Sequence, residues 1–275
     1  MKPILKRGFP FWALLLLSAC IREERSGCPT WLRLDLSSVP SQIEQIHLLF
    51  ATETQEVIFQ DTLYAGQWHQ PYEIPLRKGW VLVAAFGNIR QMELQGNTYR
   101  IPTGKQADSV YTDFHQRELR HEQDQIILCP QKNFITVTLE VTGKQPDEPL
   151  PQLYFEGSAD GYDLQGSVSS GQFHYRLGCR DAAKMTTQPS QTTTRHNSLY
   201  RGRIPRQKDD QLQLIVYLDP NTCYRFPIGS AMYQAGIDMS QDELPDWHFL
   251  LDLSLMTLTL ETEDWIRMDP IEAIL

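Results

Sequence analysis

The chain has 275 residues, a formal net charge of −9 and a sequence pI near 5.3. This acidic balance disfavours nucleic acid as a partner, because binding to phosphates normally requires a basic face. Hydrophobic residues make up 41% and aromatic residues 10% of the chain, which excludes a largely disordered protein. A body of about 250 residues behind an N-terminal signal is long enough for two domains, each with its own core.

The N-terminus has the pattern of a secretory signal. Positive charge at Lys6 and Arg7 precedes an apolar run over residues 9–17, and the sequence Leu-Ser-Ala then leads to Cys20. A membrane-spanning helix needs about 20 apolar residues, so this run is too short to be one. Charge, apolar centre and small residues together predict a cleaved signal peptide over residues 1–19.

The cysteine makes this signal more specific. Leu-Ser-Ala-Cys resembles the bacterial lipobox, which implies that Cys20 becomes the diacylated, palmitate-bearing first residue of a mature lipoprotein. Several acyl chains bind a protein durably to a membrane. The acid-containing stretch after Cys20 resembles the tag that exports Bacteroidales lipoproteins to the outer cell face, and residues 20–29 form the lipidated tether. An ordinary signal peptide and a plain solvated tether are the alternatives.

Apolar residues in the body recur with period two, which is typical of strands with one buried face. This alternation occurs in residues 31–36, 135–141 and 212–218. The run 80–86 is apolar throughout and predicts a strand covered on both faces. At Leu255-Met256 the alternation slips by one residue, which favours a β-bulge over a break between two strands. Residues 107–119 are the only weak helix candidate.

Many short strands with few helices predict an all-β chain of antiparallel β-sandwiches. Gly87-Asn88 and Asp160-Gly161 are among the dipeptides that indicate turns. The polar stretch that begins at Arg120 favours an N-terminal β-sandwich over residues 30–130 and a C-terminal one over residues 131–275. A later boundary within 143–151 is the alternative.

Residues 181–198 have the composition of a long exposed loop. Basic residues gather in and around this loop, over residues 176–208. Asp181 is the one acidic residue within that range. This basic loop could meet an anionic surface or lipid phosphates. Solvated charges that discourage pairing at strand edges are the simpler interpretation.

No catalytic motif stands above background: the sequence lacks Gly-x-Ser-x-Gly, His-Glu-x-x-His and a phosphate-binding glycine loop. Asp160 and Asp163 offer two oxygen ligands, too few for Ca²⁺. We therefore expect no enzyme activity, cofactor, metal or small-molecule substrate. The tryptophans in strand patterns are expected in the core: Trp31, Trp80 and Trp247. Four cysteines follow Cys20, with disulfides and buried thiols both open: Cys28, Cys129, Cys179 and Cys223.

A series of short motifs, in order, resembles the fimbrillin-type anchor and accessory lipoproteins of Bacteroidales type V fimbriae. The motifs are Cys28-Pro29-Thr30-Trp31-Leu32, Ala84-Ala85-Phe86-Gly87-Asn88, Asp108-Ser109-Val110-Tyr111, Lys132-Asn133-Phe134-Ile135, Asp160-Gly161-Tyr162-Asp163, Arg203-Ile204-Pro205-Arg206-Gln207 and Phe226-Pro227-Ile228-Gly229. This resemblance runs along the whole chain. It implies two tandem domains of transthyretin-like topology and no enzyme activity.

The resemblance also implies a mode of assembly. Stalk subunits of that family are cut after an arginine beyond the first strand, and a neighbour's C-terminal strand fills the groove by strand addition. Residues 37–50 contain no arginine, which fits an anchor that keeps its first strand and its lipid. Cleavage at Arg22, Arg25 or Arg33 is the alternative.

The C-terminal segment 265–275 is then a candidate donor strand, with apolar positions at Trp265, Ile266, Met268, Ile271 and Ile274. Pro270 counts against this role because proline cannot donate to a ladder, and an ordinary terminal strand is the alternative. The partners implied are fimbrial stalk subunits and the outer membrane. A surface lipoprotein that binds carbohydrate or a host ligand, and a fimbrial tip adhesin, are the competing functions.

Overall fold

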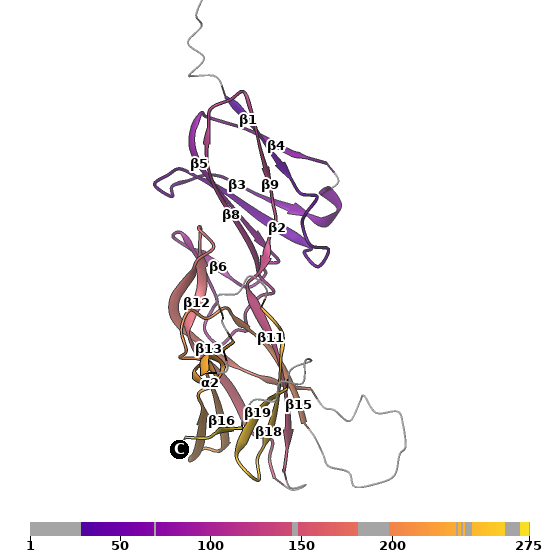
Figure 1. Ribbon diagram of the computed structural model, residues 1–275, viewed down its shortest axis with the longest axis vertical. Coiled ribbons are helices and arrows are strands. Elements are labelled where there is room, and N and C mark those ends of the chain that lie inside the picture. The colour runs from indigo at the N-terminus through magenta and orange to yellow at the C-terminus, as the bar shows by residue number, and fades with distance from the viewer. Residues whose placement is uncertain are drawn as a thin grey trace, which may run out of the picture.

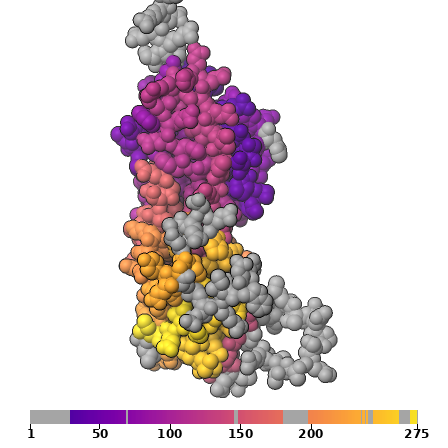
Figure 2. Space-filling model, in the orientation of Figure 1, coloured from indigo at the N-terminus to yellow at the C-terminus, as the bar shows by residue number. Residues whose placement is uncertain are grey.

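The structure is a computed structural model that describes residues 29–68, 70–144, 148–180, 198–234, 236–237, 239, 244–261 and 270–274. Two β-sandwiches lie one after the other along the long axis, so the molecule is elongated (Figures 1 and 2). The prediction of an all-β chain with two sandwich domains is confirmed. Within the described residues, no helix is long and apolar enough to cross a membrane.

The first sandwich packs a three-stranded sheet against a five-stranded one. The smaller sheet has the order β4 (Tyr72–Leu76), β1 (Thr30–Asp35), β9 (Gln123–Ile127). The larger has the order β10 (Gln131–Lys132), β8 (Tyr111–Leu119), β5 (Gly79–Gly87), β2 (Gln45–Ala51), β3 (Val57–Tyr64). A short 3-10 helix, η2 (Ala65–Gln67), follows β3.

The second sandwich is built from two six-stranded sheets. One has the order β14 (Gly178–Arg180), β15 (Ser198–Pro205), β11 (Phe134–Thr142), β18 (Trp247–Asp252), β19 (Thr257–Glu261), β20 (Ile271–Glu272). The other contains β17 (Thr222–Phe226), β16 (Gln213–Asp219), β12 (Gln152–Asp163), β7 (Thr98–Arg100) and β6 (Glu93–Gln95), with β13 (Val168–Arg176) also on β12. Helix α2 (Ile228–Gln234) follows β17.

Each sandwich opens with a strand that lies inside its sheet. β1 pairs antiparallel with β4 and parallel with β9, and β11 pairs antiparallel with β15 and parallel with β18. The alternating residues of both strands point into a core, with Leu32, Leu34, Ile135 and Val137 fully buried. Period two therefore predicted these strands correctly, while the two parallel pairs depart from a purely antiparallel sheet.

The apolar run in β5 is buried on both faces, as predicted. Val81, Val83 and Ala85 join the core of the first sandwich. The alternate residues, which include Leu82 and Phe86, face the hairpin of β6 and β7 and join the core of the second sandwich. The two sandwiches thus share apolar packing through a sheet that has no solvent face at its centre.

The β6–β7 hairpin ties the two halves of the chain together. It precedes residue 130, yet β7 pairs with β12 of the second sandwich. Gly161 of β12 allows this approach, because a Cβ there would lie 2.1 Å from the carbonyl oxygen of Tyr99. The limits 30–130 and 131–275 stay a prediction. Two elements cross the limit at residue 130: the β6–β7 hairpin pairs with the second sandwich, and β10 pairs with β8 of the first.

Several local predictions were wrong. Residues 253–256 form a turn between β18 and β19 instead of a bulge, because Asp252 Oδ1 accepts the backbone N–H groups of Ser254 and Leu255 and Met256 has a φ of 52°. The weak helix candidate 107–119 contains strand β8, which is paired along its length with β5. Asp160-Gly161 lies within β12, and the turn comes a few residues later at Gly166.

Two of the three tryptophans were also misplaced by the pattern. Trp247 is buried as predicted, but Trp31 is 47% and Trp80 48% exposed. Trp31 is in phase with Arg33 on the outer face of β1, and Trp80 lies at the start of β5, beyond the part of the strand that is covered. Residue type suggested burial at both positions, whereas strand phase decided the exposure of Trp31 and position along the strand decided that of Trp80.

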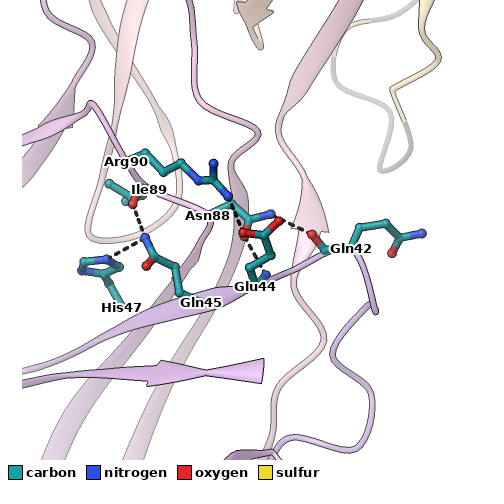
Figure 3. A network of polar contacts seen from close by, with 7 residues as sticks. All are labelled: Gln42, Glu44, Gln45, His47, Asn88, Ile89 and Arg90. Atoms are coloured by element: carbon teal, nitrogen blue, oxygen red, sulfur yellow. Dashed lines mark hydrogen bonds and ion pairs between the residues drawn. The ribbon is translucent and has the colours of Figure 1, made fainter. Parts of the chain in front are cut away.

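Asn88 fastens the end of β5 to the start of β2 (Figure 3). It adopts a positive φ of 60°, which asparagine tolerates better than most residues. Its side-chain oxygen accepts the N–H of Glu44 at 2.8 Å, and its amide donates to the carbonyl of Gln42 at 3.0 Å. Gln45 donates back to the carbonyl of Ile89, and Arg90 pairs with Glu44. The predicted turn at Gly87-Asn88 therefore directs the chain toward the second sandwich.

Candidate functional site

The C-terminus lies in the part of the second sandwich that is away from the N-terminal sandwich (Figure 1). In β20, Ile271 and Glu272 pair with Leu258 and Thr257 of β19. Two residues later, Ile274 forms a bridge with Arg225 of β17, in which each backbone N–H donates to the other carbonyl at 2.9 Å. The chain end therefore joins the edges of both sheets of the second sandwich.

The candidate donor residues fall into two groups. Ile271 is buried at 8% exposure, whereas Ile274 is 59% exposed. Trp265, Ile266 and Met268 lie outside the described residues, as do Cys20 and the tether before residue 29. The assignment of these residues to a donor strand and of Cys20 to lipidation stays a prediction.

The first strand is bound much more extensively than the last. β1 has a register of five residue pairs with β4 and five with β9. Thr30 Oγ1 donates to the carbonyl of His121 at 2.7 Å, and the N–H of Trp31 donates to the carbonyl of Glu122 at 2.9 Å. Arg33 lies inside this paired segment, so a protease cannot reach its peptide bond without unfolding the sheet.

A polar network lies where the sandwiches meet, and its centre is Arg206 just after β15. Its Nε donates to Asn133 Oδ1 at 2.6 Å, one terminal nitrogen donates to the carbonyl of Met239 at 2.7 Å and the other to the carbonyl of Lys132 at 3.2 Å. The Tyr162 hydroxyl donates to the Asn133 carbonyl and accepts the N–H of Arg206. Complete burial raises the pKa of Tyr162 well above its usual range.

Residues next to this network extend it across the junction. Asn133 donates its amide to Thr112 of β8. Lys132 pairs with Asp246 at 2.6 Å, and its ammonium lies 5.0 Å from the centre of the Phe134 ring. The motifs quoted for the resemblance over residues 132–135, 160–163 and 203–207 thus meet in space. Sequence order alone showed no reason for them to do so.

The basic loop does not form one patch in the part of it that the structure describes. Arg206 belongs to the junction, Arg203 donates to the carbonyl of Ala107 at 2.9 Å, and Lys208 contacts Ser170. Desolvation by burial lowers the pKa of Arg203. Residues 181–197 lie outside the described residues.

The fold brings no metal-binding group and no cysteine pair together among the described residues. Among the described residues, no group of three His, Cys, Asp or Glu side chains could bind a metal ion. Cys129 and Cys223 are free thiols, Cys179 is exposed, and Cys28 lies outside the described residues. The fold brings the chain end to the edges of both sheets of the second sandwich, and it gathers a polar network where the two sandwiches meet.

Solved structures share this fold over most of the chain. The fimbrial anchor protein Mfa2 from Porphyromonas gingivalis matches with a TM-score of 0.67 and 14% identity, over 90% of this chain and 100% of that chain. A protein proposed to be an adhesin, from Bacteroides thetaiotaomicron, matches with a TM-score of 0.59 and 11% identity, over 88% of this chain and 99% of that chain. A DUF1812 protein from the same organism, proposed to bind polysaccharide, matches with a TM-score of 0.57 and 10% identity, over 86% and 99%.

The sequence matches no protein-family model and no curated protein. At these identities the likeness establishes the fold. The chain has the two-sandwich fold of the Mfa2 anchor protein and of adhesin-like proteins of Bacteroides, and this is the fold that the resemblance to fimbrillin-type lipoproteins implied.

Proposed function

We propose that the protein is a non-enzymatic anchor or accessory subunit of a fimbrium, bound to the outer membrane by lipid on Cys20 and joined to stalk subunits by β-strand addition. The observation that carries the proposal is the contrast between the chain ends. β1 pairs on both sides, whereas in the described part of the C-terminal segment β20 pairs through two residues and Ile274 forms a single bridge.

This contrast fits the two tasks of an anchor. A first strand that stays in its sheet next to the tether transmits the membrane attachment to the body. A last strand with few ladder bonds can leave its own sheet at low cost, because terminal segments with few contacts open locally. Its apolar residues are then available to a neighbour's groove, with backbone bonds supplying affinity and side-chain pockets supplying specificity.

The proposal is tested in cells that carry the full chain with residues 265–275 deleted. We expect this variant to stay in the outer membrane while fimbriae are shed into the medium. Cys20→Ala tests the other end, and the protein itself should then leave the membrane fraction. Leu255→Ser is the matched control, since this exposed side chain lies on a turn of the same sandwich. Normal fimbrial attachment after the deletion contradicts the donor role.

Surface proteolysis and immunogold labelling distinguish the remaining alternatives. Label at fimbrial bases that protease removes supports an outward-facing anchor, and label at the tips supports a tip adhesin. Protease resistance without fimbrial label contradicts both. A surface lipoprotein that binds carbohydrate or a host ligand is favoured by a separate feature of the second sandwich.

A further inference from the structure

We propose that the outer face of the second sandwich carries a binding cleft for a neutral oligosaccharide. A depression of about 920 Å³ lies over the side chains of β12, β13, β16 and β17 and against the start of α2. Ligand sites commonly have about 300–1,000 Å³. The inference does not depend on the anchor role, because the cleft is formed entirely by residues of the second sandwich and by Thr103 of the preceding loop.

The floor of the cleft is an ordered group of planar polar side chains. Glu156 lies on β12 between its neighbours in the sheet, with its Oε1 3.1 Å from His174 Nδ1 and its Oε2 3.2 Å from an Arg225 terminal nitrogen. That nitrogen also donates to Gln213 Oε1 at 3.3 Å. The side chains of Glu156, His174 and Arg225 are 40–46% exposed, so they are positioned by one another and still open to a ligand.

Neighbouring groups keep this floor and its wall in place. The His174 ring stacks on Tyr154 with centroids 5.0 Å apart and an interplanar angle of 27°. On the wall, Ser230 of α2 donates to Asp210 Oδ2 at 3.3 Å. Gly229 brings α2 so close that a Cβ would lie 2.4 Å from the carbonyl oxygen of Asp210. Preorganised polar groups bind with a smaller entropy cost.

The charge balance of the cleft selects the class of ligand. The cleft is lined by two carboxylates, Glu156 and Asp210, and by one guanidinium, Arg225, which already contacts Glu156. An anionic ligand therefore finds no uncompensated positive charge. Carboxylate, guanidinium and amide groups each offer paired acceptors or donors in one plane, and such pairs match adjacent hydroxyl groups on a sugar ring.

The position of the cleft in the sheet disfavours an extended peptide strand. β12 pairs with β13 on one side and β16 on the other, so the floor presents side chains and no open ladder. Side-chain groups supply the binding energy here, as expected for a hydroxyl-rich ligand. Gln172 and Gln211 add two further amides to the lining.

The test is titration of the full-length chain with neutral hexose oligosaccharides, in a detergent without a sugar headgroup. We expect saturable binding that weakens at least tenfold in Glu156→Gln and in Gln213→Ala. Both changes are small and at the surface, and equal melting temperatures will show that the variants fold. Arg176→Ala is the matched control, because Arg176 lies on β13 two residues beyond His174, is exposed and does not line the cleft.

Three outcomes overturn the proposal. These are absence of binding to any neutral oligosaccharide, unchanged binding in both cleft variants, and tighter binding of sialylated or sulfated sugars than of neutral ones. Loss of fimbrial attachment in the 265–275 deletion, with sugar binding retained, supports both proposals separately. Loss of sugar binding in Glu156→Gln with normal fimbriae supports the cleft alone.

Discussion

The first and last strands of the described chain are bound to the fold in very different ways. β1 lies in the middle of its sheet and places Leu32 and Leu34 fully in the core. β20 lies at the edge of its sheet, has two residues and buries only Ile271. The difference predicts that the first strand unfolds only with the whole sandwich, whereas the last strand, with its short ladder, frays first.

The largest expected effect is at the first strand. Leu34→Ala should reduce the free energy of unfolding by about 4 kcal/mol, because it leaves a cavity in a core with no exposed side. Ile271→Ala should cost about 1 kcal/mol or less, since a short terminal strand can fray locally. Urea denaturation followed by circular dichroism measures both. Equal losses would show that the two ends are bound alike.

The polar network around Arg206 is expected to make the two sandwiches unfold together. Arg206→Met should destabilise the protein by about 2 kcal/mol, because it leaves the part-buried acceptors of Asn133, Lys132 and Met239 without their charged donor. We expect two unfolding transitions in calorimetry in place of one. Arg201→Met is the control, as Arg201 is exposed on β15, the strand that Arg206 follows. A single transition with unchanged midpoint would show that the network does not couple the sandwiches.

The pairing of β7 with β12 is a second contact that is expected to couple the two sandwiches. Gly161→Ala should cost about 2 kcal/mol or more, because its Cβ would overlap the carbonyl of Tyr99 and separate β7 from β12. Faster hydrogen exchange should appear at residues 93–100 and leave β1 protected. Gly178→Ala has open space around the new Cβ and serves as the comparison. Unchanged exchange in the hairpin contradicts this account.

The smallest expected effect is a pH dependence of the free energy of unfolding, which arises from His47 in the first sandwich. Burial lowers the pKa of His47 below its usual 6.5, so the unfolded chain binds a proton more readily than the folded protein. Stability therefore falls as the pH drops through 6.5. His47→Gln should reduce the loss between pH 7 and pH 5 in thermal melts. An identical pH profile in the variant would assign the loss to other groups.

Local pattern predicted much of the fold, and its errors have identifiable causes. The alternation in 135–141 predicted β11 correctly because one face of that strand is buried and the other is not. The slip at Leu255-Met256 favours a bulge in the sequence because no turn residue marks it, whereas in the structure Asp252 forms a turn with its side chain. Trp31 was expected in the core by residue type, although its phase with Arg33 places it outside.

The candidate sites were harder to predict from the sequence than the strands were. Ile271 and Ile274 stood out as apolar positions near the end, but their split between two sheets depends on strands more than ten residues away. Glu156, His174 and Arg225 carried no signal, because they come from three strands and meet only when β12 is flanked by β13 and β16.

The sequence by itself determined which residues share a strand face, since side chains alternate along any extended backbone. It therefore determined an all-β body with a first strand of leucines, and it predicted the secretory signal before that body. Tertiary structure alone decided what each face meets. It paired β7 with β12, gathered Arg206, Asn133 and Tyr162 at the junction, and opened a cleft on one sheet. The reason is that alternation is a property of neighbours in sequence, whereas pairing across sheets is chosen by the packing energy of the whole chain.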